Sequence, residues 1–221
     1  MIFIDIHTHH LPAKPGGFFI KNIYPSDQVE LLEPGGFYSV GLHPWHIANN
    51  NEHKAKLAEL EQKASLPEVI AIGECGLDKL ANTESQLQLS TFIEHSRVAE
   101  ALNKPLIIHC VKCYNEISHL KRKMKPTVPW ILHGFNGNDL IAKQLLALDF
   151  YFSLGRMIFN QEASVGQALS AIPPDRLFFE TDEWNHPVEE VYRKYAELTG
   201  KPLDEVKEKI LWNFRKVFIR E

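Results

Sequence analysis

The sequence repeatedly places a short apolar run immediately before a polar residue. Runs such as 106–108 and 130–132 are wholly apolar, which is typical of strands that are buried on both faces. The polar residues that follow the runs lie 34, 31, 35, 24, 20 and 29 residues apart, and they are His9, His43, Glu74, His109, His133, Ser153 and Asp182. Each interval has room for a strand and a helix. The pattern therefore predicts parallel strands joined by helical crossovers.

Amphipathic helical patterns fill most of these intervals. Apolar residues recur at helical spacing in 54–64, 115–124, 138–148 and 162–172, in the segment from Leu89 to Leu102, and in two closing helices at 187–198 and 202–218. The segment 10–36 is different, because its four prolines and two Gly-Gly pairs leave room for only one short strand at 18–23. We therefore expect a shortened second strand–helix unit.

Two architectures are compatible with alternating strands and helices. An open doubly wound sheet brings together only the strand ends near its switch point, whereas a closed barrel gathers all of them in one ring. Because every run ends in a polar residue, the sequence predicts the α/β class and a distorted (β/α)8 TIM-type barrel. A length of 221 residues suits one such domain, spanning residues 1–221.

The first strand ends in side chains that bind metals. Side chains alternate between the two faces of a strand, so Asp5, His7 and His9 point to the same side. Two imidazoles at this spacing can bind one ion, and Asp5 can serve as a further ligand or hold an imidazole in one tautomer. The pattern is that of half a metal site.

Six potential ligands lie on the predicted ring of strand ends. They are His7, His9, Glu74, His109, His133 and Asp182. Six ligands, including a carboxylate that can bridge, exceed the needs of one tetrahedral zinc ion and predict two divalent ions, Zn, Mg or Mn. Two such ions activate water and polarise a phosphoryl or carbonyl oxygen. Hydrolysis is therefore the predicted chemistry.

Composition limits the partners and the compartment. A formal net charge of -4 and a pI near 6.3 exclude the globally basic surface of a protein that binds duplex nucleic acid. Three cysteines favour a reducing cytoplasm over a disulfide framework, and Cys110 and Cys113, although spaced as Cys-x-x-Cys, are expected to be core-filling thiols. No apolar run approaches the roughly 20 residues that span a membrane. We expect a cytoplasmic protein without membrane association or an obligate protein partner.

The order and content of the motifs resemble the TatD family of metal-dependent hydrolases. The motifs are Asp5-Ile6-His7-Thr8-His9, Gly41-Leu42-His43-Pro44, Ile72-Gly73-Glu74-Cys75-Gly76-Leu77-Asp78, His133-Gly134-Phe135-Asn136-Gly137 and Glu180-Thr181-Asp182. The resemblance covers essentially the whole chain. It implies a distorted TIM barrel and phosphodiester hydrolysis on DNA.

The resemblance also implies a role for each ligand. Glu74 would bridge two ions, with His7, His9 and Asp182 on one ion and His109 and His133 on the other. Asp182 would in addition orient or deprotonate the attacking water. Glu74 and Asp182 are thus the predicted catalytic residues.

The departures from the family pattern concern the substrate. The family commonly has Ser-Arg-Asp after the fourth-motif histidine, where this chain has Cys110-Val111-Lys112. Lys112 replaces the missing arginine only in part, because it lacks the bidentate fork that grips a phosphate. After Asp182 the usual proline and basic insertion are absent. We therefore expect a smaller, less basic pocket, with His43 and Lys112 as substrate contacts.

These observations predict a divalent-metal phosphodiesterase or deoxyribonuclease of the 3′ exonuclease type. Its substrate would be single-stranded nucleic acid or a small phosphoester. One alternative is a small-molecule ester, amide or lactone hydrolase on the same barrel. Another is a non-catalytic metal-binding module, which the intact ligand set, Asp182 included, disfavours.

Overall fold

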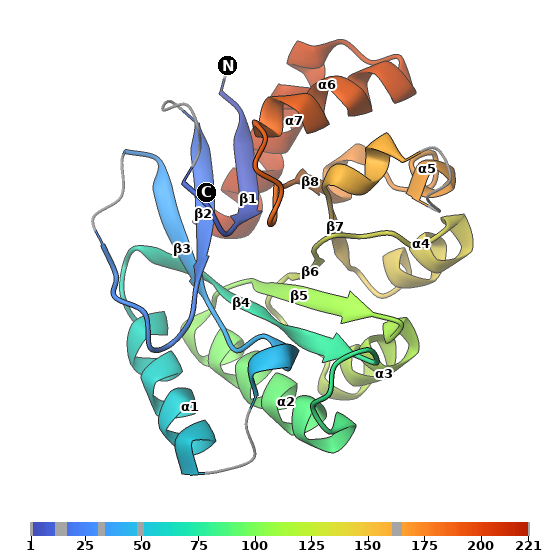
Figure 1. Cartoon of the computed structure of the whole chain (residues 1–221). Coiled ribbons are helices and arrows are strands. Elements are labelled where there is room, and N and C mark those ends of the chain that lie inside the picture. Colours follow the sequence, from blue (N-terminus) through green and yellow to red (C-terminus); the bar gives the residue numbers. More distant parts are fainter. Residues whose placement is uncertain (1, 12–16, 31–33, 48–50, 161–164, 221) are drawn as a thin grey trace.

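Eight parallel strands form one sheet that curls into a nearly closed barrel in the computed structural model (Figure 1). The structure describes residues 2–11, 17–30, 34–47, 51–160 and 165–220. The strands are β1 (Ile4–Thr8), β2 (Phe18–Ile23), β3 (Gly36–Val40), β4 (Val69–Asp78), β5 (Leu106–Val111), β6 (Trp130–Leu132), β7 (Tyr151–Leu154) and β8 (Leu177–Phe179). Their order in the sheet follows the sequence. The predicted α/β barrel is confirmed.

Main-chain contacts close the barrel between its first and last strands. Thr8 and Asp182 form an isolated parallel bridge, and the Asp182 N–H donates to the carbonyl oxygen of His7 at 2.9 Å. The His9 N–H donates in turn to the carbonyl oxygen of Asp182 at 3.2 Å. These main-chain contacts hold three predicted ligands, His7, His9 and Asp182, at one end of the barrel.

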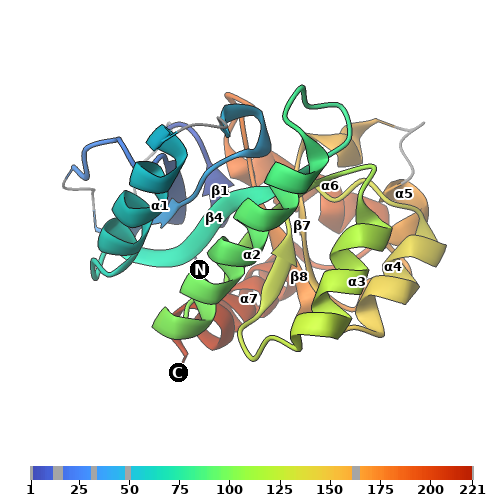
Figure 2. The same cartoon turned by 90° about the horizontal axis from the view of Figure 1, so that it is seen from below.

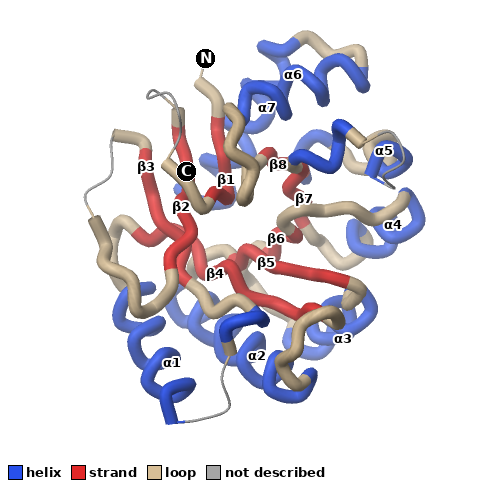
Figure 3. The backbone as a smooth tube through the Cα atoms, viewed as in Figure 1, coloured by secondary structure: helices blue, strands red, loops and turns tan. Residues whose placement is uncertain are grey.

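Helices surround the strands, as Figure 3 shows. They are α1 (Asn51–Ala64), α2 (Ser85–Leu102), α3 (Tyr114–Met124), α4 (Asp139–Leu146), α5 (Val165–Ala168), α6 (Val188–Thr199) and α7 (Leu203–Phe214). Helices α1 to α4 follow one another around the outside of the sheet (Figure 2). Only 165–168 of the predicted helix 162–172 is α-helical, and 162–164 lie outside the described residues. None of the described helices is long and apolar enough to cross a membrane.

The predicted shortening of the second unit is confirmed, and it extends to the first. In residues 9–11, 17, 24–30 and 34–35, the described parts of the two connections among β1, β2 and β3, the chain forms no helix. The C-terminal helix covers these strands instead. Phe214 stacks on Phe18 with ring centroids 5.3 Å apart, and it also contacts Phe37 at 6.2 Å. The predicted helix 202–218 is in fact α7 followed by a π-helical segment, η4 (Arg215–Ile219).

Strand β4 is longer than its apolar run predicts. The uninterrupted apolar run ends at Gly73, but pairing with β5 continues and places Gly76 opposite His109. The two backbones approach so closely that a Cβ on Gly76 would overlap the carbonyl oxygen of His109. The pairing of β4 with β5 therefore continues beyond Glu74. The close backbone approach that accompanies this pairing cannot be recognised from the hydrophobic pattern of the sequence.

A side chain at Gly76 is expected to destabilise the barrel. Gly76→Ala should force β4 and β5 apart and lower the free energy of unfolding by about 1–3 kcal/mol, measured by urea unfolding. Gly166→Ala is the matched control, because nothing lies within 4 Å of that added Cβ. It should be neutral or slightly stabilising. Equal unfolding midpoints for the two variants would contradict the close approach.

Candidate metal centre

The six predicted ligands converge at the C-terminal ends of the strands. His7 and Glu74 lie within β1 and β4, His109 lies within β5, and His9, His133 and Asp182 follow β1, β6 and β8. A parallel barrel places these ends around one point. The spatial grouping predicted from the sequence is therefore present, although the residues span positions 7 to 182.

The carboxylate of Glu74 lies at the middle of the group. Its Oε2 is 3.5 Å from Nε2 of His7 and 3.4 Å from Nε2 of His9. Its Oε1 is 2.8 Å from Nε2 of His133 and 2.9 Å from Nδ1 of His109. One carboxylate thus separates two pairs of imidazoles, each pair facing a different oxygen.

Asp182 completes the side that contains His7 and His9. Its Oδ1 lies 3.7 Å from Nε2 of His7 and 3.6 Å from Nε2 of His9. The side chain is 37% exposed, compared with 5% for Glu74. Its backbone has a φ of +55°, which is uncommon for a residue other than glycine and is often found at functional sites. Asp182 is therefore the solvent-accessible carboxylate of the group.

The donors fit a divalent cation. Both ring nitrogens of His7 are buried without a hydrogen-bond partner among the described residues. Buried polar atoms are costly unless something pairs with them, and a metal ion would do so. Donor atoms lie within 4.8 Å of one another in three sets: His7, His133 and Asp182; His7, His9 and Glu74; His43, Glu74 and His109. Imidazole and carboxylate donors suit zinc or manganese.

Two carboxylates that the sequence did not assign orient the imidazoles. Nε2 of His109 lies 3.3 Å from Oδ2 of Asp78, and Nδ1 of His133 lies 3.3 Å from Oε1 of Glu180. A proton held toward each carboxylate leaves the opposite nitrogen with its lone pair facing the cluster. Glu180 is fully buried immediately after the apolar strand β8. Such a buried charge is the sequence signal that would have identified it.

His43, a predicted substrate contact, lies against Glu74. Its Nδ1 accepts a hydrogen bond from the Trp45 backbone N–H, so a neutral ring carries its proton on Nε2. That nitrogen lies 3.3 Å from Oε1 of Glu74. Burial lowers the pKa of His43 and so favours the neutral ring. Lys112 is exposed and makes no hydrogen bond or ion pair with the cluster in the described chain.

Charge on the cluster is strongly coupled. Burial raises the pKa of Glu74, but the surrounding imidazoles, His133 first, outweigh burial and hold that pKa well below its usual value. Burial lowers the pKa of His133, but the charges of Glu74 and Glu180 outweigh it and hold the pKa well above normal. When no metal is bound, this coupling favours the ionised form of Glu74 and the protonated form of His133. A bound cation would take the place of that proton.

Asp5 does not have either of its predicted roles. Its Oδ2 accepts a hydrogen bond from the Thr181 hydroxyl at 2.6 Å and its Oδ1 accepts the Thr181 N–H at 3.1 Å, so it joins β1 to the segment after β8. Burial raises the pKa of Asp5 to about 7.

Asn22 was also not assigned from the sequence, and its Oδ1 accepts the Glu74 N–H at 2.5 Å. No motif marks Asn22, because it lies in the short strand β2.

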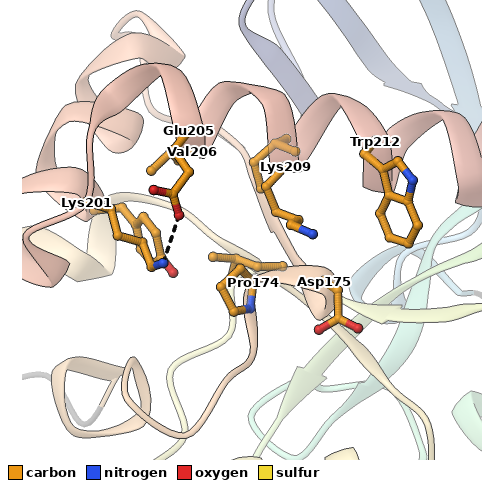
Figure 4. Close-up of a pocket in the computed structure, with 10 residues that line it drawn as sticks. Pro174, Asp175, Lys201, Glu205, Val206, Lys209 and Trp212 are labelled. Carbon is orange, nitrogen blue, oxygen red and sulfur yellow. Dashed lines mark hydrogen bonds and ion pairs between the residues drawn. The ribbon is translucent and has the colours of Figure 1, made fainter.

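A hollow on the protein surface lies away from the cluster. It has a volume of about 380 Å³ and is lined by residues of α6, α7 and the turn before β8, including Lys201, Glu205 and Trp212 (Figure 4). None of the predicted ligands lines it.

The three cysteines are free, and burial raises the pKa of the Cys110 thiol, as expected of core-filling thiols.

Comparison with known proteins agrees with the geometry. Residues 26–219 match the family model described as TatD related DNase. An uncharacterized metal-dependent hydrolase from Buchnera aphidicola is 34% identical over 65% of this chain and 54% of its own length. The 3′-5′ ssDNA/RNA exonuclease TatD from Cronobacter turicensis is 34% identical over 67% and 57%, respectively. The chain therefore spans less than two thirds of the length of these two relatives.

Solved structures share the fold over nearly the full length. The TatD homolog YJJV from Escherichia coli K12 superposes with a TM-score of 0.82 at 22% identity, covering 98% of each chain. A TatD family hydrolase from Entamoeba histolytica superposes with a TM-score of 0.78 at 15% identity, covering 100% of this chain and 99% of its own. The family model covers most of the sequence, and the barrel is the one these structures share. The chain therefore belongs to the TatD family of metal-dependent hydrolases.

Proposed function

We propose that this protein uses divalent metal ions to hydrolyse phosphodiester bonds, releasing nucleotides from the 3′ end of single-stranded nucleic acid. The observation that carries the proposal is the position of Glu74 between two pairs of imidazoles. The exonuclease name of a relative that is 34% identical supports the substrate class. The free thiols of all three cysteines suit the cytoplasm as the site of action.

In this proposal the ligands divide between two ions. His7, His9 and Asp182 would hold one ion, His109 and His133 would hold the other, and Glu74 would contribute to both. When bound, such ions supply Lewis acidity, which lowers the pKa of water and stabilises negative charge on a phosphoryl oxygen. The imidazole-rich donor set favours zinc or manganese over magnesium.

The protein's own groups would position and deprotonate the nucleophile. Asp182 is the exposed carboxylate of the cluster, so it can accept a hydrogen bond and then a proton from a water that attacks the phosphate. Asp78 and Glu180 would keep His109 and His133 in fixed orientations. His43 would hold Glu74 through its Nε2 proton.

A second candidate is hydrolysis of a small ester or lactone. One observation favours it. Glu183 lies beside the metal cluster, 3.6 Å from Nδ1 of His9 and 3.4 Å from Nε2 of His10, and 64% of its side chain is exposed. A carboxylate in this place repels a polyanionic strand more than a small neutral substrate.

Metal analysis followed by a substrate panel distinguishes the candidates. Purified protein loaded with zinc or manganese should contain about two ions per chain. It should cleave single-stranded oligonucleotides faster than p-nitrophenyl acetate or a simple lactone, and EDTA should abolish cleavage. Rapid ester or lactone hydrolysis with no oligonucleotide cleavage would favour the second candidate. Activity that survives EDTA and full removal of metal would contradict both.

A further inference from the structure

Exposed apolar side chains gather at the end of the barrel that contains the metal cluster. Of the nine large hydrophobic residues that are exposed in the described chain, five follow the C-terminal ends of strands. They are Leu11, Trp45, Leu80, Leu140 and Phe159. Single exposed apolar residues are ordinary, but several around one mouth indicate a surface that contacts a ligand.

Trp45 is held rigidly at the edge of this mouth. It lies in the short helix η1 (Pro44–His46) that follows β3. Its Nε1–H donates to Oδ2 of Asp78 at 2.6 Å, and its ring centroid is 5.0 Å from that of His43 and 6.4 Å from that of His109. Even so, 61% of the residue is exposed. The indole therefore presents a fixed aromatic surface next to the rings of His43 and His109.

A second aromatic group stands on the β8 side of the mouth. Trp184 stacks with His186 at a centroid distance of 4.3 Å and an interplanar angle of 21°, and it contacts Phe159 at 5.1 Å. Here, however, the ring already has partners within the protein. Trp45 packs only edge-on against its imidazole neighbours, with interplanar angles of 90° and 73°. It is therefore the aromatic side chain at the mouth best placed to accept a planar ligand.

Charged side chains of both signs lie at this end of the barrel, where Lys112 and Arg156 are exposed after β5 and β7. Lys79 forms an ion pair with Glu116 at 2.6 Å, and Glu183 adds negative charge beside His9 and His10. The chain as a whole carries a formal charge of -4. Two exposed cations on a chain of negative net charge supply limited electrostatic attraction to a nucleic-acid strand, so a further interaction is needed for affinity. Stacking of bases on aromatic side chains is the usual one in proteins that bind single strands.

We propose that Trp45 is a stacking platform for a nucleobase next to the scissile phosphate, and that it selects unpaired strands. This subsite rests on the proposed exonuclease function and adds the group that recognises the substrate. A base in a duplex is stacked and paired, so it cannot present its face to the indole without being splayed out. The indole is already fixed by Asp78, so little conformational entropy is lost when a base binds.

The proposal is tested with a cycle of two proteins and two ligands. A labelled single-stranded oligonucleotide is compared with the same oligonucleotide carrying abasic residues at its 3′ end, and binding is measured by fluorescence anisotropy. Both proteins carry Asp182→Asn to suppress turnover, and one also carries Trp45→Ala. Trp45→Ala should weaken binding of the normal strand by roughly 10- to 100-fold and that of the abasic strand hardly at all.

Two further variants separate stacking from other effects. Trp45→Phe keeps an aromatic face but loses the hydrogen bond to Asp78, so it should retain most of the preference for the normal strand. Trp212→Ala removes a tryptophan that is 49% exposed on α7 and lines the surface hollow of Figure 4. This variant should bind both oligonucleotides as the parent does.

The outcomes also distinguish this inference from the proposed function. Equal losses for normal and abasic strands with Trp45→Ala, or no loss, would overturn the stacking platform. So would a parent protein that binds the two strands equally or binds neither. Trp45-dependent binding without cleavage by the metal-loaded protein with an intact Asp182 would instead overturn the exonuclease and leave the base subsite standing.

Discussion

Replacing Glu74 with glutamine is expected to remove bound metal and activity together. The glutamine keeps the shape of the side chain but has one coordinating oxygen in place of two and no charge. Each Glu74 oxygen faces a different pair of imidazoles, so in the variant one pair would face an amide NH2 group and the other a neutral oxygen. Outer-sphere changes already cost about 10- to 100-fold in metal affinity or activity, so turnover should fall by at least about 10²-fold.

The measurement is metal content and turnover on the same preparation. Glu61→Gln, an exposed position in α1, is the control for loss of a carboxylate and should match the wild type. A Glu74→Gln variant that keeps its full metal complement and its activity would show that Glu74 is not shared between ions. The same prediction holds whichever ester is the substrate, because it concerns the cluster alone.

Asp182→Asn is expected to separate metal binding from turnover. The asparagine can still coordinate through its oxygen, but it cannot accept a proton from water. Turnover should therefore fall by about 10²-fold or more, the size expected when a general base is lost. The ion on the His109 and His133 side should remain, because these imidazoles are held by Asp78 and Glu180 rather than by Asp182.

Asp175→Asn provides the matched control. Asp175 lies in the turn before β8, whereas Asp182 follows the same strand at the opposite end. The control should retain wild-type turnover and metal content. If Asp182→Asn also turned over at the wild-type rate, the proton acceptor would have to be a group other than Asp182.

The fold and the convergence of the six candidate ligands were largely predictable, because both depend on where apolar runs end. Each strand of a parallel barrel is buried on both faces, so it appears in the sequence as an uninterrupted apolar run. His109 and His133 could be placed from such runs at 106–108 and 130–132. The repeated interval then implied a ring, and the ring implied that distant residues would meet.

The supporting contacts were not predictable in the same way. Asn22 holds the Glu74 main chain from β2, a pairing that depends on barrel closure rather than on spacing in the sequence. Likewise, Phe214 covers Phe18 at a separation of nearly 200 positions, in place of a helix between the first strands. The extension of β4 beyond Gly73 depends on backbone proximity to β5. Apolar periodicity contains none of this three-dimensional information.

The central claim is that this cluster, loaded with metal, hydrolyses single strands from the 3′ end. The most direct test is to incubate manganese-loaded protein with a 5′-labelled single-stranded oligonucleotide and to resolve the products by length over time. The account predicts a ladder that shortens progressively from the 3′ end, that EDTA abolishes, and that Glu74→Gln and Asp182→Asn fail to produce. An intact oligonucleotide under these conditions, or a ladder equally strong with both variants, would contradict it.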